Sequence, residues 1–382
     1  MASLTTIPSE LLSQIYNSLS TISDVINLSL TSHHFNHHLR SSNRLPTLFA
    51  AAEREFGPLE DITQLLTYNA SQLAHIKRKP QQSYALLRQM IRVGAVAKKI
   101  EELYPARRWA DNYLERRSLT IDESWRLRRA VYRYWLYCEA FQNRNYMRST
   151  RQIPQIVEER AQLLRSWTTE ELIEIEDLRT ILENIVSDDL CPTDGAAQRS
   201  FNQHCDFSGV RYNHLHQPYN QFRSWNSWPP DAYTNQALAQ SRPSTSSLFH
   251  NHFSDLKRQS SADLPIPQRR KLEMTGWGDE ISQYYTIQSV MKLNPAQILH
   301  MHENAVTRLD VESYITNHCD GGEWFWDNGQ TWLDTWSLVL YKRGEAPADV
   351  RGAVLDGEAG ITSAEGRAWL GGDDGVEGRV CS

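Results

Sequence analysis

The chain has 382 residues, room for about two or three domains of the usual size, and its 40% hydrophobic and 23% charged residues are typical of a globular protein. No apolar run approaches the roughly 18–20 residues that span a bilayer, and the start MASLTT is not that of a signal peptide, so we expect no membrane partner. Of the net charge of −6, a net −5 (eight acidic and three basic residues) falls on residues 344–382, so the remainder is nearly neutral and gives no reason to expect a nucleic-acid partner.

The N-terminal segment predicts three short helices. Pro8 suits the first turn of a helix, where its missing N–H is not needed, and Glu10 places negative charge near the positive end of that helix. Ser23 and Asp24 open the second helix, and a Thr-Ser pair opens the third. The apolar residues of the three stripes are Leu11, Leu12, Ile15 and Leu19, then Val25 and Leu28, then Phe35 and Leu39.

This segment is too small to hide its own apolar side chains. Helices shorter than about 12–15 residues are marginal in water, and a unit of roughly 40 residues without a disulfide or a metal is rarely stable alone. Each large apolar side chain contributes about 1.5–3 kcal/mol when it is fully buried. We therefore expect a partner to cover the remaining apolar surface through a helix-to-helix interface.

The order of these residues resembles the F-box. The resemblance runs through Ile7, Pro8, Glu10, Leu11, Leu12, Ile15, Leu19, Asp24 and the pair Thr31-Ser32 before Phe35. In that family, the three-helix module docks on the Skp adaptor of cullin-based SCF ubiquitin ligases. The resemblance implies that the adaptor is bound or supported by Ile7, Pro8, Leu11, Leu12, Ile15, Leu19, Val25, Leu28 and Phe35. Phe35 stands where many members have tryptophan.

The chain up to about residue 190 predicts further helices. Apolar residues recur every three or four positions at Leu86, Met90, Val93, Ala97 and Ile100. Capping boxes at Thr120 with Glu123 and at Thr168 with Glu171 mark two more helix starts. The first of these helices carries Arg126, Arg128, Arg129 and Arg133, and the second carries Glu170, Glu171, Glu174, Glu176 and Asp177. We expect two solvated faces that attract each other within the fold, with an RNA or phosphate patch as the alternative.

The composition changes after Cys191. Residues 191–275 are polar and aromatic with little periodicity, and residues 241–268 predict a long disordered loop. Two basic clusters in and just after this loop have the spacing of a bipartite nuclear localisation signal, formed by Lys257, Arg258, Arg269, Arg270 and Lys271. A basic loop without a role in import is the alternative.

Helical segments return near Trp277. The stretches ISQYYTIQSVMKL and VTRLDVESYITNH predict helices, and Trp125, Trp135, Trp332 and Trp336 are candidate core residues. From Gly344 onward, nine of the eighteen glycines and scattered acids predict a disordered tail. The predicted fold is mainly α, with a three-helix F-box in residues 1–45, a helical connector in 46–81, an irregular α-helical domain for substrate recognition in 82–343 and the tail in 344–382.

No motif in the sequence predicts catalysis, a metal or a cofactor. His33, His34, His37 and His38 have helical metal-ligand spacing but no local carboxylate or cysteine to complete a site. His302-Glu303 begins a zinc-protease pattern in which Val306 replaces the second histidine. The five cysteines are odd in number and lack C-x2-C spacing, which indicates free thiols in a reducing compartment, cytoplasmic, nuclear or both.

The leading hypothesis is therefore a substrate-recognition subunit of an SCF-type ubiquitin ligase, similar to fungal F-box proteins and not itself an enzyme. It would bind the Skp adaptor, through it cullin, and an unknown protein target. A second hypothesis is a structural or scaffolding helical protein whose N-terminal helices pack internally as a hairpin of one larger domain. A third is a metal-dependent hydrolase built on the histidines.

Overall fold

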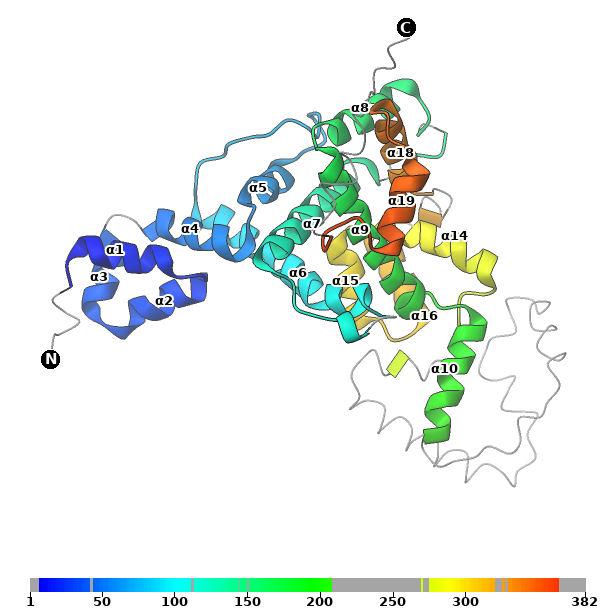
Figure 1. Ribbon diagram of the computed structural model, residues 1–382, viewed down its shortest axis with the longest axis horizontal. Helices are drawn as coiled ribbons and strands as arrows, with labels where there is room; N and C mark the ends of the chain where they lie inside the picture. The colour runs from blue at the N-terminus through cyan, green and yellow to red at the C-terminus, as the bar shows by residue number, and fades with distance from the viewer. Residues whose placement is uncertain are drawn as a thin grey trace, which may run out of the picture.

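The computed structural model describes residues 7–41, 44–110, 113–143, 145–149, 151–207, 269–270, 275–319, 325–326 and 329–363. Within these ranges the secondary structure is helical and contains no strand (Figure 1). The helices are α1 (Ser9–Ser18), α2 (Ile22–Thr31), α3 (His33–Ser41), α4 (Arg44–Phe56), α5 (Leu59–Thr67), α6 (Tyr84–Arg108), η2 (Tyr113–Glu115), α7 (Ile121–Phe141), α8 (Pro154–Arg165), α9 (Thr169–Ile185), η3 (Val186–Leu190), α10 (Asp194–Phe207), α14 (Glu280–Val290), α15 (Pro295–Asn304), α16 (Arg308–His318), α18 (Trp332–Lys342) and α19 (Pro347–Asp356).

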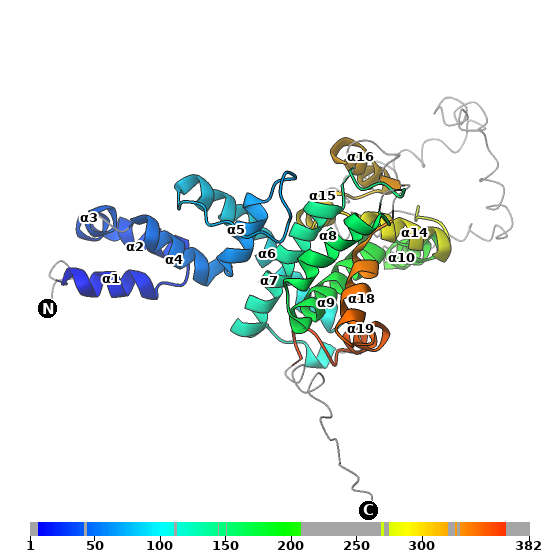
Figure 2. The ribbon, with the colours of Figure 1, turned by 90° about the horizontal axis from the view of Figure 1, so that it is seen from above.

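The first three helices form an N-terminal module that stands away from the rest of the chain. Both ribbon views show α1, α2 and α3 at one end, with α4 leading from them into the body (Figures 1 and 2). Helix α4 packs on all three helices of the module and on α5 and α6 of the body. The prediction of a mainly α fold, with three short N-terminal helices before an irregular helical domain, is confirmed.

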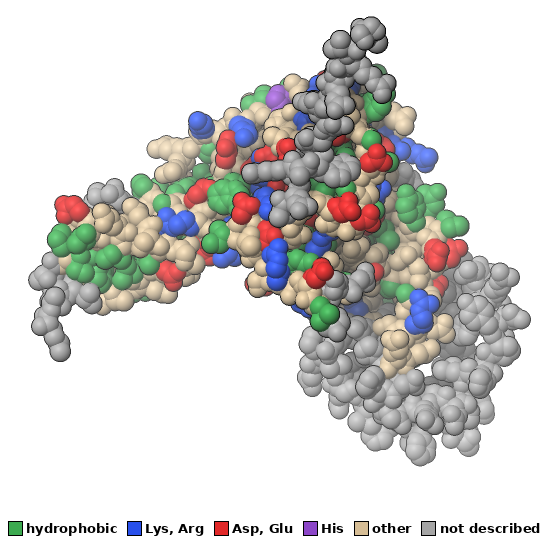
Figure 3. All heavy atoms as spheres, in the orientation of Figure 1, with side chains coloured by type: hydrophobic (Ala, Val, Ile, Leu, Met, Phe, Trp, Pro, Cys, Tyr) green, Lys and Arg blue, Asp and Glu red, His purple; other side chains and the backbone are tan. Residues whose placement is uncertain are grey.

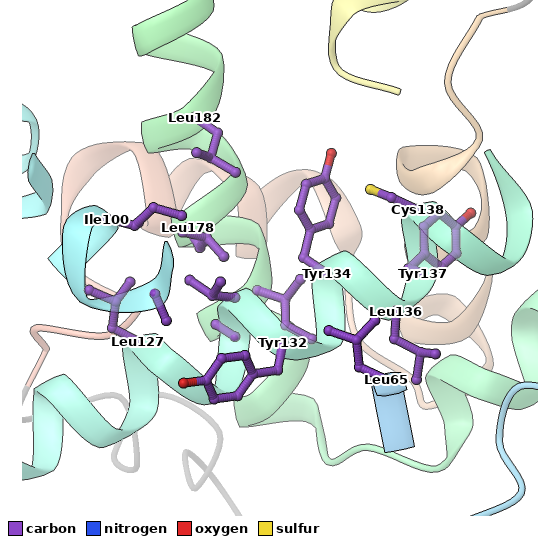
Figure 4. Packing of buried hydrophobic residues seen from close by; sticks show 14 of the residues in the cluster. Leu65, Ile100, Leu127, Tyr132, Tyr134, Leu136, Tyr137, Cys138, Leu178 and Leu182 are labelled. Atoms are coloured by element: carbon purple, nitrogen blue, oxygen red, sulfur yellow. The ribbon is translucent and has the colours of Figure 1, made fainter. Parts of the chain in front are cut away.

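Helix α7 lies at the centre of the body and is buried on most of its faces. It packs on α5, α6 and α9, and Tyr132, Tyr134 and Tyr137 on it are fully buried (Figure 4). The Tyr134 hydroxyl donates to the carbonyl oxygen of Met291 at 2.9 Å, so burial leaves this polar group paired. The indole of Trp332 meets the rings of Tyr134 and Tyr137 edge-on, with centroids 5.6 and 4.9 Å apart.

The four tryptophans expected in the core divide into two pairs. Trp332 and Trp336 on α18 are 0% and 1% exposed, as expected. Trp125 and Trp135 on α7 are only half-buried. The Trp135 ring N–H donates to Glu139 at 3.2 Å, one turn along the same helix, which keeps this indole at the edge of the body.

The arginines of α7 and the acids of α9 pair with each other across the interface between these helices. Arg129 contacts Glu171 at 3.2 Å and Glu174 at 2.5 Å. Arg133 contacts Asp61 on α5 at 2.8 Å and Glu171 at 2.7 Å. Burial raises the pKa of Glu171, but the hydrogen bond and charge of Arg133 outweigh it and leave that pKa below its ordinary value. The predicted attraction between the two faces is confirmed, but the faces are largely buried, because α7 and α9 pack directly on each other.

The expectation that a disordered tail begins at Gly344 is wrong for residues 344–363. Helix α19 occupies part of this range, packs on α9 and buries Val354 completely. Gly357, with φ of 85°, ends the helix in the left-handed conformation that favours glycine. The backbone N–H of Ile361 then donates to the buried carboxylate of Asp177 at 2.8 Å. Gly357, one of the glycines that suggested disorder, therefore ends an ordered helix.

Several expectations lie outside the described residues. They are the disordered loop predicted for residues 241–268, the basic residues Lys257, Arg258 and Lys271, and residues 364–382 of the predicted tail. The helices predicted from ISQYYTIQSVMKL and VTRLDVESYITNH are present as α14 and α16.

Candidate functional site

Helix α1 has one apolar pair turned inward and another turned outward. Leu12 and Tyr16 are 0% and 2% exposed and lie against the module's core. Leu11 and Ile15, also one turn apart, are 49% and 36% exposed. Glu10 lies in the first turn, where backbone hydrogen bonding, and then a hydrogen bond from Ser9, hold its pKa below the ordinary value.

Helix α2 repeats this division. Its start differs slightly from the expectation, because Thr21 is the N-cap and its hydroxyl accepts a hydrogen bond from the Asp24 N–H at 3.0 Å. Val25 is fully buried, whereas Ile26 and Leu30 are 41% and 71% exposed. An apolar face one turn long is thus left open on α2 as well as on α1.

Helix α3 contributes buried side chains to the core of the module and packs on α1 and α2. The Ser32 hydroxyl accepts from the Phe35 N–H at 3.3 Å, so the expected Thr-Ser start is used. Phe35 and Leu39 are 6% and 5% exposed. The buried Tyr16 hydroxyl donates to the carbonyl oxygen of Phe35 at 3.1 Å, and its ring stacks on His38 with centroids 6.1 Å apart. These contacts give the module a core of its own between α1 and α3.

Two side chains of α4 attach the module to the body. Glu55 accepts a hydrogen bond from the backbone N–H of Ile22, the first residue of α2, at 2.8 Å. Its other oxygen lies 3.4 Å from Lys98 on α6. Arg54 donates to the carbonyl oxygen of Leu19, between α1 and α2, at 2.8 Å. Glu55 therefore links a module helix to a body helix, and sequence reasoning missed it because it lies outside the motif.

The outward residues leave large apolar side chains exposed on both α1 and α2. We call Leu11, Ile15, Ile26 and Leu30 the exposed apolar set. Hydrophobic side chains gather over the part of the molecule that α1, α2 and α3 form (Figure 3). Burying a side chain of this size contributes about 1.5–3 kcal/mol, so the set provides a substantial favourable term for any partner that covers it.

The residues predicted to bind or support a partner occupy three levels of burial. Leu12, Val25 and Phe35 are buried inside the module, so they can support a surface but not form it. Ile7, Leu19 and Leu28 are partly buried and pack on the core, and Pro8, Leu11 and Ile15 are exposed. Ile26 and Leu30 were missed, and their i, i+4 spacing next to an inward Val25 is the signal that could have found them.

A comparison with protein-family models identifies the domain that this module forms. The model of the F-box domain matches residues 4–47. The N-terminal module is an F-box domain. Its F-box therefore comprises α1, α2 and α3 and ends within the start of α4. F-box domains bind the Skp adaptor of SCF-type ubiquitin ligases. Searches of curated proteins and of solved structures gave no match.

The candidate nuclear localisation signal is described at Arg269 and Arg270 only. Arg270 donates to the carbonyl oxygens of Met301 at 2.7 Å, of Ala305 at 2.5 Å and of His302, at the end of α15. Its guanidinium is thus engaged with the folded body, where it satisfies carbonyl groups that a helix end leaves unpaired. An import receptor would have to displace these contacts to bind Arg270.

Two of the histidines considered as metal ligands contact other side chains instead. His38 lies 3.1 Å from the Ser13 hydroxyl, and His302 lies 3.0 Å from Asp189. Among the residues that the structure describes, no three His, Cys, Asp or Glu side chains are grouped as metal ligands would be. Cys138 and Cys191 are buried free thiols, and burial raises the pKa of both. No described helix is both long enough and apolar enough to cross a bilayer.

Proposed function

We propose that this F-box protein is a substrate-recognition subunit of an SCF-type ubiquitin ligase. In this proposal, the F-box binds the Skp adaptor, the adaptor brings cullin, and the helical body binds a protein target. The observation that carries the proposal is the exposed apolar set on a module that matches the F-box model and stands away from the body. The work would be done in the cytoplasm, the nucleus or both.

The proposed role needs no acid, base or nucleophile from this chain. A receptor that holds a target beside a ubiquitin-loaded enzyme acts by raising effective concentration. A fixed geometry between the F-box and the body serves this purpose, since the two binding surfaces are then held at a set distance. The contacts of Glu55 and Arg54 support such a geometry, because they tie α2 and the end of α1 to α4.

The test is copurification with a co-expressed Skp adaptor. The informative variant is Leu11→Asp with Ile15→Asp, since both side chains are exposed and can be changed without opening the core. It loses two apolar contacts and places two charges in the interface, at a cost of about 3 kcal/mol or more, which is roughly a hundredfold in affinity. We expect the native chain to retain the adaptor and this variant to lose it.

The matched control is Ile281→Asp with Tyr284→Asp on α14. These side chains are also exposed, at 69% and 57%, but they belong to the body and not to the F-box. The control should retain the adaptor. Failure of the native chain to bind the adaptor, or retention by the Leu11 and Ile15 variant, would contradict the proposal. Leu12 is unsuitable for this test because it is fully buried, and its loss would unfold the module.

A further inference from the structure

A second surface of the protein is defined by its charge. Between Ile62 and Ile100 the chain has seven Lys and Arg residues and no Asp or Glu. The segment ends within α6, whose residues Leu87, Met90 and Ala97 face the core. Outside residues 344–382 the chain is nearly neutral, so these seven basic residues are a local concentration of positive charge.

Helix α6 places its basic residues in a row on its outer face. Arg88, Arg92 and Lys99 are exposed and lie within about 40° of one another around the helix axis. Arg88 and Arg92 are about 6 Å apart along the axis, and Lys99 follows about 10 Å further on. At the start of the helix, the exposed Arg44 of α4 lies over the ring of Tyr84, 5.8 Å from its centroid. We call Arg44, Arg88 and Arg92 the basic row. Lys99 is left out of this name because it pairs with Glu303.

Three carboxylates on helices that pack against α6, or on their neighbours, are paired with other cations. Glu60 pairs with Lys77 at 2.9 Å, and Glu303 pairs with Lys99 at 2.6 Å. Glu55 is shared between Lys98 and the backbone of α2. Within the described part of the chain, neither Arg88 nor Arg92 has a carboxylate oxygen within 4.0 Å. The two guanidinium groups are therefore open to an anionic partner.

We infer that the basic row binds a protein segment rich in Asp and Glu, supplied by the target. This inference rests on the proposed function, which requires the body to carry a target-binding surface. A guanidinium presents a planar set of donors that matches a carboxylate with two parallel hydrogen bonds. In an extended segment, alternate side chains on one face are about 6.6–7 Å apart, close to the spacing of Arg88 and Arg92.

A carboxylate-rich protein segment fits these observations better than a nucleic acid does. Nucleic-acid sites typically lie on domains with strong net positive charge. Of this chain's net charge of −6, −5 falls on residues 344–382 and the remainder is nearly neutral, so the row is not part of a strongly positive domain. A short acidic segment contacts the row without extending over the rest of the surface.

The experiment measures binding of a fluorescein-labelled oligoglutamate peptide to the full chain by fluorescence anisotropy. The test variant is Arg88→Glu with Arg92→Glu. Its control is Arg116→Glu with Arg199→Glu, which makes the same change in net charge at two exposed arginines elsewhere. We expect the native chain and the control to bind the peptide with similar affinity, weakening as salt rises, and the test variant to bind at least tenfold more weakly.

Three results would overturn the inference. They are no detectable binding of the peptide, an affinity of the test variant within twofold of native, and tighter binding of a single-stranded oligodeoxynucleotide of matched charge through the same arginines. The Arg88 and Arg92 variant should still copurify with the Skp adaptor, and the Leu11 and Ile15 variant should still bind the peptide. If the native chain binds the peptide through the basic row and does not bind the adaptor, the proposed function is refuted. The assignment of the basic row as a site for acidic segments would still stand.

Discussion

The link that Glu55 makes between the F-box and the body leads to a specific prediction. Glu55 is the acceptor for the N–H of Ile22, one of the backbone donors that a helix start leaves without an internal partner. The capping residue Thr21 accepts from Asp24 and does not satisfy it. The change Glu55→Ala removes this acceptor and also the partner of Lys98.

The expected cost follows from the two contacts. A hydrogen bond to a charged group contributes about 1.5–3 kcal/mol, and the side chain of Glu55 is only 14% exposed, so little water can replace it. Lys98 is 40% exposed, and such a pair adds no more than about 1 kcal/mol. We therefore expect the free energy of opening of the F-box to fall by about 2–3 kcal/mol, with the body unchanged.

Hydrogen exchange read by mass spectrometry can measure this difference by region. A fall of about 2 kcal/mol raises the exchange of the most protected α2 amides roughly thirtyfold. Peptides from α7 provide the internal reference, because that helix is buried in the body. Glu102→Ala is the matched control, since Glu102 is an exposed acid on α6 and has no ion pair among the described residues.

Two outcomes would refute the reasoning about Glu55. Unchanged protection of α2 would show that the contact does not hold the module. Equal loss of protection in α2 and α7 would show that the F-box and the body open as one unit. The F-box would then have no separate free energy of opening.

Three further changes test the packing that supports this arrangement. Leu12→Ala should destabilise the F-box by about 2–5 kcal/mol, seen as a loss of α1 protection, whereas an unchanged module would contradict its buried placement. Arg133→Met should lower the free energy of unfolding in denaturant by about 3–5 kcal/mol at neutral pH. The pKa of Glu171 is lower in the native fold than in the unfolded chain, so its ionised carboxylate stabilises the fold, and this contribution is lost as pH falls below about 4.5. The deficit of the Arg133 variant should therefore shrink below about pH 4.5. A deficit that does not depend on pH would refute the pairing of Arg133 with Glu171. Gly94→Val should cost about 1–3 kcal/mol or more, because even a Cβ there would lie 2.4 Å from the ring of Phe56, and a neutral effect would mean that α4 and α6 are not so close.

The sequence contained enough local information to predict many of the helices. The capping boxes at Thr120 with Glu123 and at Thr168 with Glu171 are both formed, because such a box depends only on residues three apart. The stripe of Met90, Ala97 and Ile100 on α6 is buried for the same local reason. Helical period alone was sufficient for these elements.

Features that depend on distant parts of the chain could not be predicted in this way. The arginines of α7 were expected in solvent, but Arg133 is buried because Asp61 and Glu171 come to it from two other helices. Gly357 was counted toward disorder, yet it ends a helix that α9 holds in place. Periodicity gives the faces of a helix but not which neighbours cover them.

The candidate site was predictable in outline and not in detail. The motif located the F-box, and the small size of the module predicted that apolar residues would remain exposed. It did not separate the supporting Leu12 from the exposed Leu11, which differ by one position and point about 100° apart around the helix axis. Ile26 was missed although its i, i+4 spacing with Leu30 marks a second apolar stripe on α2, because the motif includes Val25 and Leu28 and not these two residues.

Hydroxyl-radical labelling of side chains, with and without the Skp adaptor, tests most directly whether a partner covers the F-box. Leu11, Ile15, Ile26 and Leu30 should each be labelled in the free chain, and the adaptor should lower their labelling several-fold. Exposed Ile281 of the body should be labelled equally in both states. Equal labelling of the four F-box residues with and without bound adaptor would contradict the account.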